Sequence, residues 1–207
     1  MKILAPLYSK RYEYGSKLNF FDTIPGVPYY RLYLPLKQMA EDYEDVEVVF
    51  TDGMNNISDK NLEGVDIVLV SYSYIGSSFF KRVKSKGIKI IIDVDDNLRL
   101  AFFHNEFKEH TKKRITERIE TLLKFCDGII VTGEQLKKKL QNLNKNILIA
   151  GNFVDDTLPA YNTKPAKNKK LKCGYAGGIT HNEDIKLLLS AAKNNEIILS
   201  LSYFEKF

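Results

Sequence analysis

Short runs rich in valine and isoleucine recur along the chain, and they constrain its fold more than any other feature. The runs are Lys2–Leu7, Val46–Phe50, Ile67–Ser71, Ile88–Asp93, Gly128–Thr132 and Ile147–Ile149. Each is apolar at nearly every position, which is typical of parallel strands that are buried on both faces. Segments with leucine and isoleucine at helical spacing lie between them, such as the stripe Ile115, Ile119, Leu122 and Leu123. The alternation predicts βαβ units, and therefore an α/β fold with a Rossmann-like parallel sheet.

Two helix starts carry local signals. Thr132 lies three residues before Gln135, which is the spacing of a capping box. Pro28 suits the first turn of a helix, so the sequence predicts that Arg31 lies one turn inside that helix.

A break in the pattern predicts the domain organisation. Residues 161–170 are polar and basic and show no apolar period, so we interpret them as a linker between residues 1–160 and 171–207. The last region contains a predicted strand, Lys172–Ala176, then a helix and a strand, Ile197–Leu201. One βαβ unit of this size cannot bury both faces of its sheet. We therefore expect a complete first domain and only the beginning of a second Rossmann-like domain.

Composition narrows the functional classes. The 207 residues are 44% hydrophobic and carry a net charge of +5, which is the balance of a folded protein that favours anionic ligands. The lysine clusters lack interleaved aromatic residues, which argues against nucleic-acid binding. Cys126 and Cys173 show no metal-site or disulfide spacing, so the sequence predicts a reducing, cytoplasmic location. No apolar run approaches the roughly 20 residues of a membrane span, which leaves peripheral membrane contact open.

The first candidate site is Asp93-Val94-Asp95-Asp96, at the end of an apolar predicted strand. In open α/β sheets, ligands bind outside the carboxyl ends of the strands. The D-x-D spacing fits Mg²⁺ or Mn²⁺ bound to a diphosphate, because hard cations prefer carboxylate oxygens. Alternatively, one aspartate accepts the proton of a hydroxyl group or orients it. A third interpretation is that Asp95 and Asp96 only cap or solvate a loop.

The second candidate site is the glycine pair Gly177-Gly178, which follows the predicted strand of the second region. Glycines permit a tight turn and a close backbone approach to a ligand. Thr180 and Glu183 form a second capping box, and the free N–H groups of such a helix start attract phosphate. The carboxylate of Glu183 in the same turn opposes this interpretation.

Further candidates lie near the N-terminus and after the acidic loop. Tyr8 and Tyr14 belong to a long aromatic connection, which predicts a binding loop, or rings that pack under the loop. The guanidinium of Arg31 suits a phosphate or a carboxylate, with a surface or ion-pairing arginine as the alternative. His104 is a candidate base, with an exposed surface histidine as the alternative. No Ser-His-Asp order, zinc spacing or Walker A loop occurs.

Several of these motifs occur together in one order. They are Gly26-Val27-Pro28-Tyr29-Tyr30-Arg31 with Pro35, Ile92-Asp93-Val94-Asp95-Asp96-Asn97, the Cys126–Thr132 strand with Leu136, Gly151-Asn152-Phe153-Val154-Asp155, and Gly174–His181 with Asp184. This order resembles the GT-B glycosyltransferases, specifically their GT4-like group, over most of the chain. In such enzymes two Rossmann-like domains face each other across a cleft, the first mainly holding the acceptor and the second the nucleotide sugar.

The resemblance implies roles for particular residues. Asp95 and Asp96 are expected on the cleft wall of the first domain, where we assign them the catalytic role. We assign acceptor binding to Tyr8, Tyr14, Arg31 and His104. Gly177, Gly178, Thr180 and His181 are expected to border the donor phosphates or sugar. GT-B enzymes generally need no metal for the chemistry, so the resemblance weakens the metal interpretation and implies no cofactor.

The implied function is transfer of a sugar from a nucleotide-diphosphate donor to the hydroxyl of a glycan or other acceptor. The second domain of the family continues beyond the length present here, so we expect an incomplete donor site and weak or absent turnover. One alternative is a non-catalytic glycan- or protein-binding module. The other is a metal-dependent GT-A-type transferase that uses Asp93 and Asp95 with Mg²⁺ or Mn²⁺.

Overall fold

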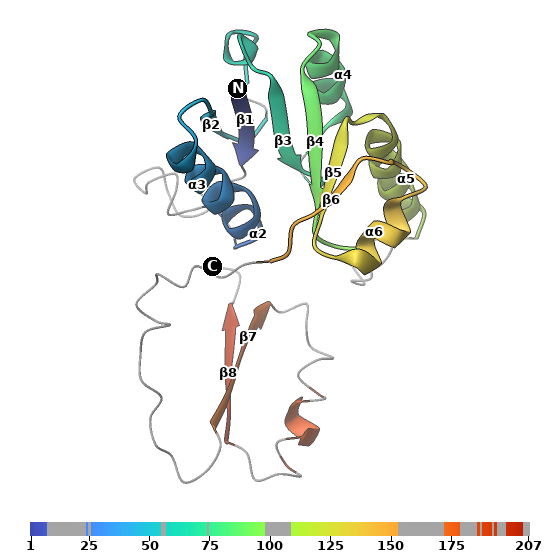
Figure 1. Cartoon of the computed structure of the whole chain (residues 1–207). Coiled ribbons are helices and arrows are strands. Elements are labelled where there is room, and N and C mark those ends of the chain that lie inside the picture. Colours follow the sequence, from blue (N-terminus) through green and yellow to red (C-terminus); the bar gives the residue numbers. More distant parts are fainter. Residues whose placement is uncertain are drawn as a thin grey trace. The chain divides into compact units, whose positions relative to one another are not determined.

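A computed structural model describes most of the chain. The described residues are 1–7, 24, 26–54, 57–73, 75–97, 109–152, 172–178, 186, 188–191, 193 and 198–204. They belong to two compact units, Met1–Asp155 and Asp156–Phe207, which Figure 1 shows with their elements labelled. The predicted linker, residues 161–170, lies outside the described part of the chain.

The first unit contains a six-stranded sheet with the order β2-β1-β3-β4-β5-β6, and all its neighbouring strands are parallel. The strands are β1 (Lys2–Leu7), β2 (Glu47–Asp52), β3 (Ile67–Ser71), β4 (Lys89–Val94), β5 (Gly128–Val131) and β6 (Ile147–Ile149). The predicted α/β fold with a Rossmann-like parallel sheet is confirmed. The bounds of β1, β3 and β6 are those expected from the apolar runs. β2 and β4 begin one residue later and end two and one residues later, respectively, and β5 ends one residue earlier.

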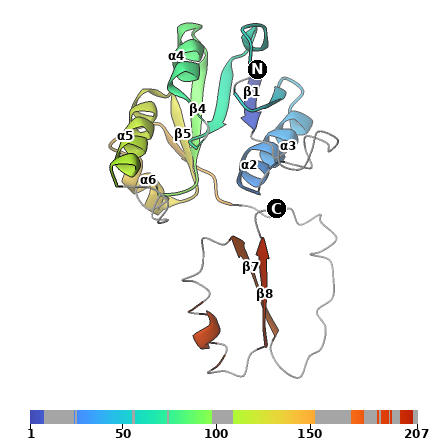
Figure 2. The same ribbon diagram turned by 180° about the vertical axis from the view of Figure 1, so that it is seen from behind.

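Helices cover the two faces of this sheet unequally (Figures 1 and 2). The helical segments are α2 (Gly26–Pro28), the π-helical η2 (Tyr29–Tyr33), α3 (Leu34–Asp42), the 3-10 turn η3 (Lys60–Leu62), α4 (Ser77–Ser85), α5 (Glu109–Phe125) and α6 (Glu134–Leu140). The continuous run α2-η2-α3 packs on one face, and α4, α5 and α6 pack on the other.

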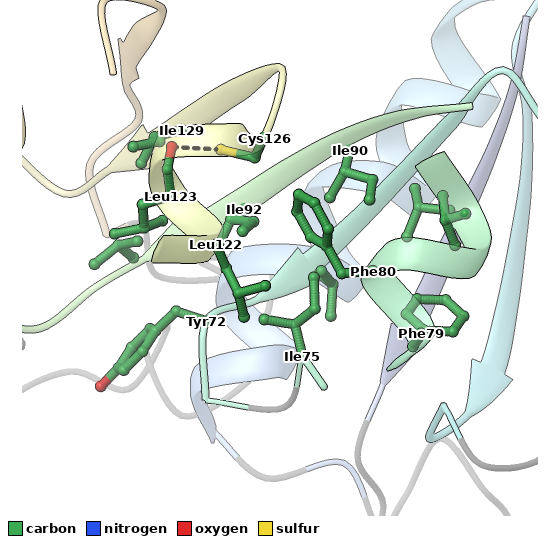
Figure 3. Close-up of a cluster of buried hydrophobic side chains, with 14 of the residues drawn as sticks. Tyr72, Ile75, Phe79, Phe80, Ile90, Ile92, Leu122, Leu123, Cys126 and Ile129 are labelled. Atoms are coloured by element: carbon green, nitrogen blue, oxygen red, sulfur yellow. Dashed lines mark hydrogen bonds between the residues drawn. The ribbon is translucent and has the colours of Figure 1, made fainter. Parts of the chain in front are cut away.

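The larger core lies under α4, α5 and α6. Figure 3 shows part of it, with side chains such as Phe80 and Leu122. Phe80 and Leu122, from α4 and α5, are at most 7% exposed and belong to the same cluster as Ile90 and Ile92 of β4. Burying a side chain of this size stabilises a fold by roughly 1.5–3 kcal/mol. β4 and the helices α4 and α5 therefore contribute much of the buried centre of the unit.

The opposite face is covered only in part. Leu32 of η2 and Leu36 of α3 are buried in a cluster with residues of β1 and with Leu69 of β3. At the far edge of the sheet, Leu148 of β6 is 64% exposed. The edge strands β2 and β6 are thus not buried on both faces, contrary to the expectation from their apolar runs. An apolar run shows that a segment can be buried, but the position of its strand in the sheet decides whether it is.

The second unit contains the parallel pair β7 (Lys172–Gly178) and β8 (Ile198–Phe204). Residues 186, 188–191 and 193, which lie between these strands, are helical. The first strand was expected to end at Ala176, but β7 continues through Gly177 and Gly178, which pair with Tyr203 and Phe204. The two glycines therefore belong to the end of a strand.

Candidate functional site

The carboxyl edge of the sheet is where the topology favours a site. The strand order changes direction between β1 and β3, and open parallel sheets bind ligands at the carboxyl ends of the strands near such a point. The helical segment that follows β1 and the residues that follow β4 both begin at this edge. They carry Arg31 and Asp95, respectively.

The π-helical segment η2 sets the position of Arg31. Pro35 has no amide hydrogen for the carbonyl of Arg31, four residues earlier, and the helix is wider at this point. Leu32 is buried beneath the segment, and Tyr33 packs against Phe50 of β2 with 5.1 Å between the ring centroids. Arg31 is therefore held by a locally widened helix that is anchored on both sides.

Arg31 and Asp93 form a buried ion pair. The Arg31 Nε donates to Asp93 Oδ2 at 2.9 Å and Nη2 donates to Oδ1 at 2.5 Å, which is the forked geometry that favours arginine over lysine. Their side chains are 4% and 1% exposed. Burial raises the pKa of Asp93, while the hydrogen bond and the charge of Arg31 act in the opposite direction.

The same guanidinium reaches the end of β6. Arg31 Nη1 donates to the carbonyl of Ala150 at 3.0 Å and to Oδ1 of Asn152 at 2.8 Å. The amide of Ala150 in turn donates to the carbonyl of Val131, at the end of β5. Arg31 therefore joins the helix after β1 to the carboxyl ends of β4 and β6. It fixes the edge on which Asp95 lies.

Asp95 lies beside a depression of about 300 Å³ at this edge. The depression is lined by Asp95, Asn97, Thr132, Gly133, Glu134, Gln135, Leu136 and Lys139. Burial, then the charges of Asp96 and Asp93, raise the pKa of Asp95 to about 6, against the lowering effect of Arg31. A carboxylate with this pKa is ionised at neutral pH and is a better proton acceptor than an ordinary aspartate.

The start of α6 differs from the prediction. Its N-cap is Gly133, with an extended backbone and no side-chain cap, so the predicted capping box at Thr132 and Gln135 is wrong. β5 ends at Val131, and the two residues after it bring the chain into α6. Thr132 and Gln135 instead line the depression beside Asp95.

The residues do not fit a metal bound by the D-x-D pair. Both carboxylate oxygens of Asp93 accept hydrogen bonds from Arg31, so a cation would have to displace the guanidinium. Within the described residues, no group of three or more histidine, cysteine, aspartate or glutamate side chains is placed to hold a metal.

The structure brings some of the predicted site residues together. Arg31, Asp95 and the exposed Asp96 share the carboxyl edge of the sheet. Tyr8, Tyr14, His104, Thr180 and His181 lie outside the described residues, and Gly177 and Gly178 lie in the second unit. The assignment of these residues to the acceptor and the donor stays a prediction.

Sequence reasoning missed some residues of this edge. It did not identify Asp93 as the partner of Arg31 or the contact of Arg31 with Asn152. It also did not place Asn97 and Lys139 beside Asp95. The ion-pairing alternative for Arg31 is the one that the structure contains. Its partner lies 62 residues away in the sequence, and no local pattern links the two.

Comparison with known proteins gives a structural similarity only. No protein-family model and no curated protein matches the sequence. The chain is similar to the crystal structure of Arabidopsis thaliana UGT89C1 complexed with UDP-L-rhamnose, with 11% sequence identity and a TM-score of 0.46. The aligned part covers 97% of this chain and 64% of that protein.

In the described part of the chain, no helix is both long and apolar enough to cross a lipid bilayer.

Proposed function

We propose that the chain functions in a glycosyltransferase of GT-B type, which transfers a sugar from a nucleotide-diphosphate sugar to an acceptor hydroxyl. The observation that supports the proposal is the environment of Asp95. This residue has a pKa raised to about 6 and lies beside a depression at the carboxyl edge of a parallel sheet. The motif order of the sequence supplies the reaction class.

In the proposed reaction, Asp95 accepts the proton of the acceptor hydroxyl. The hydroxyl oxygen forms a bond to the anomeric carbon of the donor sugar. The bond from that carbon to the diphosphate oxygen breaks, and its electron pair leaves with the diphosphate. Asp96 assists because its charge raises the pKa of Asp95.

The remaining roles follow from the resemblance of the sequence. Gly177, Gly178, Thr180 and His181 are assigned to the donor phosphates or sugar. Tyr8, Tyr14 and His104 are assigned to the acceptor. The resemblance assigns Arg31 to the acceptor, but its side chain is buried and bonds Asp93 and the end of β6. We propose instead that Arg31 keeps the edge beneath Asp95 in one geometry.

The experiment measures transfer by the 207-residue chain from radiolabelled UDP- and GDP-sugars to a panel of oligosaccharides, with release of the nucleotide diphosphate as a second readout. Turnover is expected to be weak, so the label transferred is accumulated over long incubations. Asp95→Asn is expected to reduce it by about 100-fold, to background, because the amide accepts no proton. The wild-type rate should rise as pH increases through about 6. Asp59→Asn is the matched control, since Asp59 is an exposed residue that pairs with Lys86.

Binding measurements distinguish the proposed transferase from the alternative function, a non-catalytic binding module. Titration with the same oligosaccharides and with free UDP or GDP separates the two functions. The transferase predicts binding of both ligand classes, whereas the module predicts glycan binding alone. Transfer that Asp95→Asn leaves unchanged would refute the role of Asp95.

A further inference from the structure

A larger hollow lies on the outer side of the helical layer, between α4 and α5. It is a groove of about 680 Å³, lined by Ser77, Phe80, Lys81, Lys84, Arg118, Thr121, Leu122 and Phe125. It shares none of these residues with the depression beside Asp95. The groove is therefore separate from the proposed reaction site.

The floor of the groove is apolar. Phe80 and Leu122 are 7% and 5% exposed, and both belong to the core cluster that Figure 3 shows. Phe125, at the last position of α5, is 67% exposed and continues this apolar surface outwards. An exposed phenylalanine that extends an apolar hollow is a common mark of a binding surface.

The walls of the groove are cationic. Lys81 and Lys84 lie on the α4 side and Arg118 lies on the α5 side. None of the described lining residues is acidic. One carboxylate lies close by, since Lys84 Nζ contacts Asp127 at 2.9 Å. A ligand that combines an apolar surface with negative charge on both of its flanks would complement this lining.

We propose that the groove binds an amphipathic helix of a partner protein, with an apolar stripe flanked by aspartate or glutamate. A groove between two packed helices accepts the ridge of a third helix, whose anchors recur at positions i, i+3 or i+4, and i+7. The two cationic walls match carboxylates on both sides of that stripe. A membrane surface fits less well, because Phe125 is the single exposed apolar residue of the described lining, whereas Phe80 and Leu122 lie at the bottom of a hollow.

The test uses two fluorescent helical peptides with the same leucine and phenylalanine stripe, one flanked by glutamate and the other by lysine. Fluorescence anisotropy with the full chain at low ionic strength should show at least about tenfold tighter binding of the glutamate peptide. This preference should decrease as salt is added, because the contacts are electrostatic.

Charge reversal provides the decisive variant. Lys81→Glu combined with Arg118→Glu should reverse the preference, so that the lysine peptide binds more tightly. The control, Lys37→Glu combined with Lys113→Glu, makes the same change in net charge at exposed lysines outside the groove and should keep the original preference. Phe125→Ser should weaken the binding of both peptides. Circular dichroism confirms that each variant is folded.

Three outcomes would overturn the proposal. The first is equal binding of the two peptides to the wild-type chain. The second is association with anionic phosphatidylglycerol vesicles that the groove variant abolishes, without selective peptide binding, which would assign the groove to a membrane. The third is concentration-dependent dimerisation that the same variant abolishes, again without selective peptide binding, which would assign it to a second copy of this chain.

Discussion

An ion pair lies at each end of β4, and the two pairs differ in their access to water. At the carboxyl end, Arg31 and Asp93 are 4% and 1% exposed. At the amino end, Lys84 and Asp127 are 36% and 33% exposed. Asp127 also accepts a hydrogen bond from the amide of Ile90 at 2.7 Å. The buried pair fixes the edge that carries Asp95, whereas the half-exposed pair ties the chain before β5 to β4.

The two aspartates show opposite pKa shifts, because burial prevails at one carboxylate and favourable contacts prevail at the other. Burial is the largest influence on Asp93 and raises its pKa, with Arg31 opposing it. Burial also acts to raise the pKa of Asp127, but the Ile90 amide and Lys84 outweigh it, and the pKa is lowered. The Asp127 carboxylate therefore stabilises the fold above about pH 4, and this contribution is lost as the pH falls through its folded pKa.

The largest effect is expected for Asp93→Asn. The amide leaves the Arg31 guanidinium buried without an opposite charge, which should lower the free energy of unfolding by about 3–5 kcal/mol. Urea denaturation monitored by circular dichroism measures the change. A double replacement, Arg31→Met with Asp93→Leu, should recover part of the loss, because no unpaired charge remains. A loss below about 1 kcal/mol in the single variant would show that the buried pair is no more important than a surface pair.

A smaller effect of opposite sign is expected for Asp95→Asn. The folded pKa of Asp95 is about 6 against an ordinary value of 3.8, so its contribution to stability is greatest below about pH 4 and is lost as the pH rises through about 6. Replacing the carboxylate should therefore increase the free energy of unfolding at pH 7 by up to about 3 kcal/mol. Thermal unfolding at pH 7 and pH 4 tests the sign. An increase that is equal at both pH values would exclude titration of Asp95 as its cause.

The sequence predicts the carboxyl end of β4 only in part. The strand itself follows from its apolar run, and its parallel pairing follows from the βαβ alternation, whereas its place between β3 and β5 was not predicted. The acidic residues after β4 were identified because ligands bind at the carboxyl ends of such strands. The pairing of Arg31 with Asp93 was not predicted, since it depends on the packing of η2 against the sheet. The pKa of Asp95 likewise depends on burial and on charges placed by the fold.

At the amino end, Lys84→Met should have a small effect. The pair is about one-third exposed, so water screens it, and Asp127 keeps its bond from the Ile90 amide. We expect a loss of about 0.5 kcal/mol in the free energy of unfolding, and a smaller loss in 1 M salt. Urea denaturation at both salt concentrations measures it. A loss of unfolding free energy as large as that of Asp93→Asn would show that the buried and the partly exposed ion pairs contribute equally to stability.

The smallest effect concerns Cys126, which also lies near the amino end of β4. Its thiol should be nearly unreactive in the folded protein. Burial raises its pKa to about 11. Its Sγ donates to the carbonyls of Leu123 and Gly128, each at 3.2 Å. Only the thiolate reacts readily, so reaction with a disulfide reagent requires local opening of this end. In a Cys173→Ser background, where Cys126 is the only thiol, the reagent should modify the unfolded chain at once and the folded chain only slowly. Rapid modification of the folded chain would show that the amino end opens easily, and that its half-exposed ion pair does not hold it closed.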